Sequence, residues 1–412
     1  MALPPLRYVD AFPVDQAGQR YICLRDPEGI VEHQIVLTPA AFFVATQLDG
    51  ESDVRAIQRA FAQQFGGQEA AAEDILRIVN DLDEQGFLLS ERFEARRQHV
   101  ETAFLESALR PAYLAGKSYA EQAGALRAFL NEQFTTHSGG PGEAPGAQPG
   151  SGDPLRCLIA PHIDFHRGGH AYARAYLELF KQGRPDVVII FGVAHISPPA
   201  PFVLTRKAFD TPFGALLTDQ DLVRQLEAAC SWDPYAYEMV HRTEHSIEFQ
   251  AVMLSYLYGP NVRIVPILCS TFGSELGSVE PAHLSAVNTF LETCQDIVAT
   301  LGKRVSVIAG ADLAHVGRRF GDDFDISEPI VEGVAERTGK ICSTSPRAMQ
   351  TAFTVPSCKI ATNAVSAVSI AFTPRSKRSP AVASPANCST MITPMTRQAA
   401  SFRLRMWLSP EP

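Results

Sequence analysis

The sequence lacks the patterns that mark several common classes of protein. It has no CxxC pair, and its eight cysteines are scattered singly, which argues against a disulfide framework or a structural zinc site. It also lacks a glycine-rich phosphate loop, a GxGxxG motif and a GxSxG elbow, so nucleotide binding and serine-hydrolase chemistry have no support. Cys157 and Cys269 fall within apolar strand patterns, where we expect buried, reduced thiols.

Long apolar runs and an excess of positive charge are also missing. No stretch approaches the roughly 18 apolar residues of a membrane span, and the N-terminus lacks the basic region and apolar core of a secretory signal. A net charge of −9 without a basic stripe argues against a nucleic-acid partner. We therefore expect a cytoplasmic protein with neither a membrane nor a nucleic acid as partner.

The 412 residues, 46% of them hydrophobic, allow two or three domains with cores of their own. Residues 1–100 have the pattern of a first unit. Two short strand patterns, the second at 34–37, precede a helix that Thr38 would cap. Ser52 is expected to cap a second helix, and Gly86 to end a third. We predict a small, winged-helix-like α+β domain.

The apolar spacing of this first unit is similar to that of a known family. The segments IVLTPAAFFVATQLDGESDVRAIQRAF and ILRIVNDLDEQGFLL resemble the PqqD-like family, whose members bind a precursor peptide by adding it to a strand. The resemblance implies a peptide ligand paired with the strand edge at 34–37. The alternative is a packing or dimerisation module without a peptide ligand.

Farther along the chain, three apolar runs each break off into a histidine. The runs in LRCLIAPH, VVIIFGVAH and VSVIAGADLAH are typical of buried strands and lead to His162, His195 and His315. A fourth histidine, His245, opens the helix-like segment EHSIEFQAVMLSYLY. Because ligands bind beyond the carboxyl ends of the strands in open α/β sheets, we predict a shared metal or catalytic site.

Carboxylates near these histidines extend the candidate site. Neutral imidazoles are common ligands for iron, copper and zinc, and two histidines with one carboxylate leave positions open for substrate and O₂. Glu244 adjoins His245, whereas Glu248 is either a pocket carboxylate or a solvated helix charge. Asp312 is expected to orient an imidazole as an acceptor, and His315 to act as an acid/base group or a ligand.

Other histidines are weaker candidates. His166 lies four residues from His162, but the RGG between His166 and His170 does not favour a helix. We expect His241 on the surface.

Several motifs from residue 110 onwards occur in an order that identifies a second resemblance. They are RPAYLAGKSYAEQAGALRAFLNEQF, APHID with RGGHAYARAY, VVIIFGVAHIS, FDTPFGALLTD, RTEHSIEFQAVML, RIVPILCS and VIAGADLAHVGRRFGD. They resemble the MEMO family, the B component of the AMMECR–MEMO–radical SAM gene trio. The resemblance implies a domain over 109–340 with an α/β sandwich similar to the class III extradiol dioxygenases. Residues 135–154, rich in glycine and proline, would form a flexible surface insertion within it.

The same resemblance implies a metal-capable pocket made by His162, His195 and His245, with the DLAH element supplying the rest. We assign candidate catalytic roles to His245, His315 and Asp312. Ala314 stands where some family members have a cysteine that serves as a metal ligand. Without a thiolate, Fe(II) is the expected metal, with copper or zinc as alternatives.

Two functional hypotheses follow. In the first, the chain is a metal-binding oxidoreductase resembling the extradiol dioxygenases. In the second, it is a non-catalytic metal- or peptide-binding protein of a radical SAM-associated modification system, with radical SAM and AMMECR-type proteins as partners.

Residues 341–412 differ from the rest of the chain in charge and composition. They carry eight basic residues and one acidic residue, Glu411, and are dominated by serine, threonine, proline and alanine. They do not resemble the closing strands of the MEMO family, which suggests a frame change in the source gene. A native, basic and disordered tail is the alternative.

Overall fold

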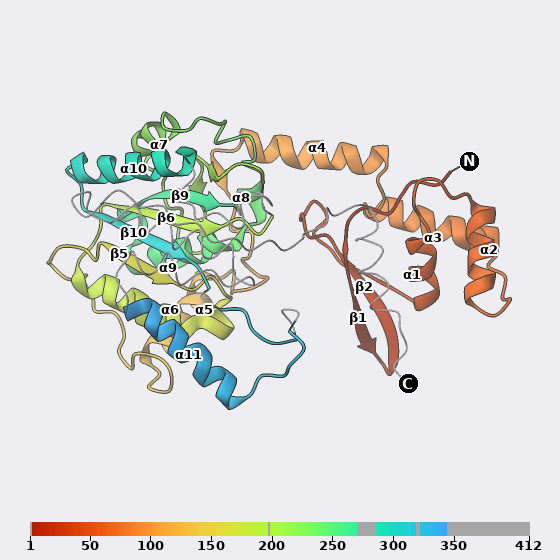
Figure 1. Cartoon of the computed structure of the whole chain (residues 1–412), viewed down its shortest axis with the longest axis horizontal. Helices are drawn as coiled ribbons and strands as arrows, with labels where there is room; N and C mark the ends of the chain where they lie inside the picture. The colour runs from red at the N-terminus through yellow and green to blue at the C-terminus, as the bar shows by residue number, and fades with distance from the viewer. Residues whose placement is uncertain (1, 197, 271–284, 313, 319–321, 344–412) are drawn as a thin grey trace, which may run out of the picture. The chain divides into compact units, whose positions relative to one another are not determined.

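The computed structural model describes residues 2–343, apart from 197, 271–284, 313 and 319–321 (Figure 1). Its last described element is helix α11, Glu328–Ser343. The predicted change of character over 341–412 therefore lies almost wholly outside the described residues. In the part of the chain that is described, no helix is both long enough and apolar enough to cross a lipid bilayer.

The first part of the chain forms a small α+β module, as predicted. Its strands make an antiparallel sheet in the order β1-β2-β3, and residues from this sheet and from three helices share one core, including Leu24, Val44, Ile57 and Ile75. The elements are β1 Asp10–Gln16, β2 Gln19–Arg25, β3 Ile35–Leu37, α1 Pro39–Thr46, α2 Val54–Gln64 and α3 Ala72–Gln85. Helix α4, Glu91–Glu106, follows.

The helix ends of this module follow local signals in the sequence. Thr38 accepts a hydrogen bond from the first turn of α1, and Gly86 ends α3 with a left-handed φ of 82°, which suits a residue without Cβ. The cap of α2 is Asp53, so the prediction of Ser52 was wrong. The Ser52 hydroxyl donates to the Asp49 carboxylate instead.

A five-stranded sheet organises the larger, C-terminal part. Its order is β5-β10-β6-β9-β7, with the first four strands parallel and β7 antiparallel to β9. The strands are β5 Cys157–Ala160, β6 Val187–Val193, β7 Phe202–Leu204, β9 Arg263–Cys269 and β10 Val305–Gly310. Two shorter strands, β4 Leu109–Arg110 and β8 Ala208–Phe209, pair in parallel beside it.

Helices cover both faces of this sheet (Figure 1). Alternate residues of β6 point to opposite sides: Ile189 belongs to the core with α7 and α10, and Ile190 to the core with α5, α6 and α9. Every residue of β6 is buried, which explains its unbroken apolar run. The helices are α5 Ala123–Thr135, α6 Phe165–Gln182, α7 Gln220–Glu227, α8 Val240–Thr243, α9 His245–Tyr258 and α10 Ser285–Thr300, with a short 3₁₀ turn at Gly259–Asn261.

The glycine- and proline-rich segment 135–154 lies against α6. The Arg174 side chain donates to the carbonyls of Gly139 and Gly140, both at 2.7 Å, and Lys181 pairs with Glu143 at 2.8 Å. The segment is therefore held along the surface of the domain at several points.

The two cysteines predicted to be buried differ. Cys269 is fully buried in strand β9, as predicted. Cys157 is exposed, so the prediction for Cys157 was wrong. Cys157 is the first residue of β5, which is an edge strand of the sheet. Its position at an edge and an end explains why an apolar pattern did not bury it.

Candidate metal centre

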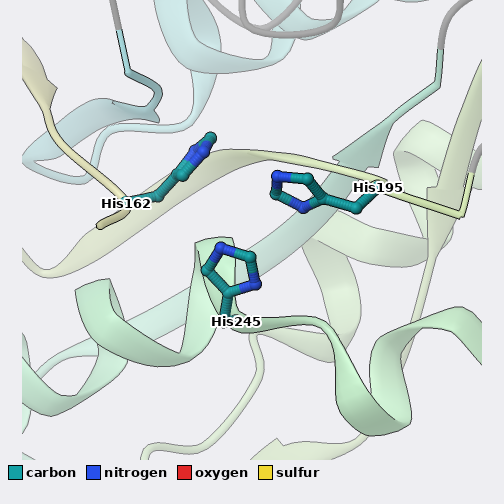
Figure 2. Close-up of side chains that lie close together, drawn as sticks. All are labelled: His162, His195 and His245. Carbon is teal, nitrogen blue, oxygen red and sulfur yellow. The ribbon is translucent and has the colours of Figure 1, made fainter. Parts of the chain in front are cut away.

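The histidines at the strand ends meet at one edge of the sheet. His162 follows β5, His195 follows β6, and both Asp312 and His315 follow β10. The strands are parallel, so their carboxyl ends lie at the same edge. Helix α9 begins with His245 at this edge. Figure 2 shows the rings of His162, His195 and His245 facing a common space.

The three rings are close enough to share one ion. Ring centroids are 5.1 Å apart for His162 and His195, 5.3 Å for His162 and His245, and 4.5 Å for His195 and His245. One nitrogen of each ring lies within 4.8 Å of the other two. His162 is buried, His245 is half-buried and His195 is exposed, so the cluster can be reached from solvent on the His195 side.

In two of the rings, Nδ1 lies at hydrogen-bonding distance from an acceptor. The Nδ1 of His162 lies 2.9 Å from the Gly310 carbonyl, and the Nδ1 of His195 lies 3.0 Å from the Glu244 carboxylate. These acceptors hold the proton on Nδ1 of His162 and His195 and leave Nε2 as the nitrogen available to a metal. The Nδ1 of His245 is 3.3 Å from the same carboxylate, close enough for a charge interaction.

The Glu244 carboxylate links two of the rings to the start of α9. It accepts hydrogen bonds from the backbone nitrogens of His245 at 2.8 Å, Ser246 at 3.0 Å and His195 at 2.9 Å. Burial raises the pKa of Glu244, but the hydrogen bond from His195 and the two nearby imidazoles outweigh it, so the pKa is far below its ordinary value. Glu244 thus stays charged and orients the histidines.

The pKa values of the histidines differ with their surroundings. Burial lowers the pKa of His162, and it lowers that of His245 to about 4. Both rings are therefore neutral at pH 7, which is the form that binds metals. Desolvation also lowers the pKa of His195, but the hydrogen bond with Glu244 outweighs it and the net shift is upward.

Asp312 and His315 form a second group around His162. Asp312 Oδ1 accepts from the backbone nitrogen of His162 at 3.0 Å, and its Oδ2 lies 3.4 Å from His315 Nε2 and 3.8 Å from His162 Nε2. Burial raises the pKa of Asp312, but the hydrogen bond with His315 and the His162 ring bring it down to about 2. The group has the two imidazoles and one carboxylate that a non-haem iron site needs.

Comparison with known proteins identifies the larger domain. The model of the Memo-like protein family matches residues 110–372, which is more than half of the chain. The chain belongs to the Memo-like family. A second model, that of coenzyme PQQ synthesis protein D (PqqD), matches residues 24–88 in the N-terminal module. Both resemblances predicted from sequence motifs are thereby confirmed.

Relatives of similar length bear the same family description. A MEMO1 family protein of Aquifex aeolicus is 28% identical over 319 residues, which cover 77% of this chain and 77% of the relative. A MEMO1 family protein of Thermus thermophilus is 31% identical over 259 residues, or 63% of this chain and 69% of the relative.

Two glycines allow α9 to approach the sheet of the Memo domain. A Cβ added at Gly192 in β6 would lie 2.5 Å from a side-chain carbon of Ile247, and one at Gly310 in β10 would lie 2.7 Å from the Ser246 carbonyl oxygen. Real Cβ atoms essentially never make contacts this short. The missing side chains on these neighbouring strands therefore let the helix start lie at the strand ends, where His245 meets His162 and His195.

Two sequence predictions for this region were wrong. In each case the side chain pairs with a residue far away in the sequence, which the local pattern does not reveal. His241 is buried, with its Nε2 3.1 Å from the Val203 carbonyl, and burial lowers its pKa to about 3. Glu248 is neither a pocket carboxylate nor a solvated charge. It is fully buried and paired with Arg110.

The RGG segment is helical, contrary to expectation. Asp164 caps α6, which begins at Phe165 and includes both glycines. Gly168 and Gly169 are needed because a Cβ there would lie 2.3 Å from Ile163 and 2.6 Å from Gln133. His166 is exposed on this helix, and its ring packs on the Phe129 ring with the two ring centroids 4.8 Å apart. Neither His166 nor His170 belongs to the groups around His162.

Arg110 and Tyr119 are the residues that sequence reasoning missed. Both lie in the motif RPAYLAGKSY that opens the Memo domain, and both contact Glu248. The available signal was an arginine directly before a proline at the start of this motif. The partners of Arg110 and Tyr119 in α9 and its cap lie more than 120 residues away in the sequence, so the signal did not identify them.

Proposed function

We propose that the Memo domain binds one redox-active metal ion, iron(II), with His162, His195 and His245 as its protein ligands. The observation that carries the proposal is the convergence of three rings, two of which already have a hydrogen-bond acceptor at Nδ1. The ligand atoms here lie within 4.8 Å of one another, so small side-chain shifts would complete the site.

The choice of iron rests on the donor atoms. Three imidazoles alone would also suit zinc or copper. Position 314, where a thiolate would favour copper(I) or zinc, holds alanine. The nearest further groups, the Asp312 carboxylate and the His315 imidazole beside His162, are oxygen and nitrogen groups and not thiolates, which is consistent with iron(II).

A bound iron would supply one-electron and dioxygen chemistry. The surrounding residues would position the reactants: the exposed side of His195 gives access from solvent, and the pair formed by Asp312 and His315, 3.4 Å apart, can hold or pass a proton. On this basis we propose an oxidoreductase resembling the extradiol dioxygenases, with His245, His315 and Asp312 as its candidate catalytic residues. A non-catalytic metal-binding protein is the alternative.

Metal titration tests the site. We expect His162→Ala and His195→Ala to weaken anaerobic iron(II) binding at least about 100-fold. Mutating a residue that only orients a ligand lowers metal affinity by about 10–100-fold, and removing a ligand itself should cost at least as much. Their apo-proteins should melt close to the wild type. His166→Ala removes a histidine outside both groups and should leave affinity unchanged. Equal stoichiometry and affinity in His162→Ala, His195→Ala and His245→Ala would eliminate the proposed centre.

Oxygen uptake separates the two hypotheses. The iron-loaded protein would be supplied with aromatic diols or candidate peptides, and O₂ consumption measured against His315→Gln. Turnover that His315→Gln lowers supports the oxidoreductase. Tight peptide binding without O₂ uptake leaves the non-catalytic binding protein.

We also propose that the N-terminal module binds an extended peptide at β3. The order β1-β2-β3 leaves β3 at an edge of the sheet, and Val36 in its middle is 49% exposed. An edge strand offers unpaired backbone groups for β-augmentation. The match to the PqqD family supports a peptide from a modification system as the ligand, with radical SAM and AMMECR-type proteins as candidate partners.

NMR titration locates the peptide. With labelled residues 1–100 and candidate leader peptides, we expect chemical-shift changes along Ile35–Leu37 and its neighbour β2. Val36→Pro removes a backbone N–H donor from β3 and should weaken binding about tenfold. Shift changes confined to the helices, or to β1 at the other edge, would refute the proposed position.

A further inference from the structure

Arg110 is a fully buried arginine at the start of the Memo domain. Its guanidinium donates to the backbone carbonyls of Pro111 at 2.8 Å, His241 at 2.9 Å and Glu244 at 2.9 Å. It also forms a hydrogen-bonded ion pair with the Glu248 carboxylate. Three of these contacts hold backbone carbonyls in place. The fourth pairs the buried charge of Glu248 with the buried charge of the arginine.

The partner carboxylate is itself fully satisfied. Glu248 Oε1 accepts from the backbone nitrogen of Leu114 at 2.9 Å and from the Tyr119 hydroxyl, while Oε2 accepts from Arg110. Burial and the neighbouring Glu248 charge raise the pKa of Tyr119, so this group remains a hydroxyl donor. The cluster of Arg110, Tyr119 and Glu248 is therefore a closed network that needs no solvent.

The two carbonyls of His241 and Glu244 lie where one helix ends and the next begins. Helix α8 ends at Thr243, and α9 starts at His245. The backbone nitrogen of His245, which could have continued the α8 ladder to the His241 carbonyl, donates to Glu244 Oε1 instead. Arg110 supplies a donor to the His241 carbonyl at the end of α8 and another to the Glu244 carbonyl at the junction.

Glu244 is thus held from two sides. Its carbonyl oxygen accepts from Arg110, and its carboxylate accepts from the His195 ring and from the first turn of α9. We propose that Arg110 is a positioning residue for the metal centre: by fixing the Glu244 backbone, it aims one carboxylate at His195 and His245. This inference rests on the proposed metal site and assigns the Arg-Pro motif a role in it.

Variants can separate this role from simple stabilisation. Glu248→Gln leaves the hydrogen bonds from Arg110 to the carbonyls but removes the carboxylate that neutralises the buried Arg110 charge. We therefore expect a lower melting temperature, with metal affinity within about threefold of wild type. The double variant Arg110→Met/Glu248→Gln removes both charges of this cluster, and the amide oxygen that it introduces can still accept from Leu114 and Tyr119. It should melt higher than Arg110→Met alone but bind metal about 10–100-fold more weakly.

Cobalt(II) is the probe, because its visible absorption reports ligand geometry as well as binding. The full-length protein would be titrated with cobalt(II), with affinity set by chelator competition. Arg110→Lys should also fold and lose affinity, since one compact ammonium cannot span both carbonyls. Arg174→Met, which removes an arginine that donates to two carbonyls elsewhere, is the matched control and should keep both spectrum and affinity.

The outcomes are distinct. Weakened binding and an altered cobalt spectrum in the double variant and Arg110→Lys, with both preserved in Glu248→Gln, support the positioning role. Wild-type affinity and spectrum in the double variant overturn it, as does affinity that follows melting temperature across all variants. A wild-type protein that binds neither cobalt(II) nor iron(II) would instead remove the metal site itself.

Discussion

At the scale of single residues, Glu244 orients two of the three histidines of the proposed metal site. One carboxylate keeps the proton of His195 on Nδ1 and also caps the helix that starts with His245. The charged form is favoured by all its donors, so the orientation holds across the physiological pH range. His162 uses a different acceptor, the Gly310 carbonyl, for the same purpose. The proposed ligands are therefore oriented by two acceptors from separate parts of the chain, Glu244 before α9 and Gly310 at the end of β10.

Ala314 gives a residue-scale prediction about metal choice. It directly precedes His315, and Ala314→Cys would introduce a thiolate, a soft ligand that copper(I) prefers. We expect copper(I) affinity to rise about tenfold or more in this variant, measured by competition with a copper(I) chelator, and iron(II) affinity to change little. Ala314→Ser has nearly the same size without the soft donor and serves as control. Equal copper(I) affinity in the cysteine and serine variants would contradict the assignment of position 314.

At the scale of elements, the centre depends on how closely α9 packs on the sheet. The Ser246 hydroxyl exchanges hydrogen bonds with the backbone of Val193 at the end of β6, with Oγ 2.9 Å from both N and O. Gly192 and Gly310 leave room for this first turn of the helix. The helix start, and with it His245, is therefore positioned by two strands as well as by Glu244 at the junction with α8.

Gly192→Ala tests this packing. The new Cβ would lie 2.5 Å from Ile247 and 2.6 Å from Ser246, so α9 must shift, and we expect a loss of about 1–3 kcal/mol of stability together with weaker metal binding. Thermal melts and iron(II) titration check both. Gly124→Ala in α5, where a Cβ meets nothing within 4 Å, should be neutral or stabilising. Unchanged metal affinity in Gly192→Ala would show that the helix position is not critical.

At the scale of the whole molecule, charged side chains tie the outer helices to the central sheet. Asp219 caps α7 by accepting from Leu222 N at 3.1 Å, and its other oxygen pairs at 2.6 Å with Lys303, which lies just before β10. Burial raises the pKa of Asp219, but the hydrogen bond with Lys303 and the cap outweigh it, and the net shift is downward. The domain is thus stabilised by the charged form of this carboxyl.

This shift predicts the acid sensitivity of the fold. Because the folded pKa of Asp219 is below its unfolded value of about 3.9, its contribution is complete above that pH and disappears as the pH falls through the folded pKa. We expect Asp219→Asn, which keeps the cap, to cost about 1 kcal/mol at pH 7, and the difference from wild type to shrink progressively as the pH falls below about 3.9. Denaturant unfolding at several pH values measures it. Asp221→Asn, on the same helix but exposed, should show no such loss, and a difference between Asp219→Asn and wild type that does not change with pH would contradict the assignment.

Sequence alone determined the elements that carry the site. The buried strand runs, the histidines directly after them and the helix that starts at His245 were all visible, because burial on both faces of a parallel sheet leaves an unbroken apolar run and parallel strands end at one edge. Only the tertiary structure decided which polar residues act there. Arg110 and Glu248 are 138 positions apart, and His241 is buried against Val203. Whether such a side chain is solvated or paired depends on partners that folding brings together, and no local pattern encodes them.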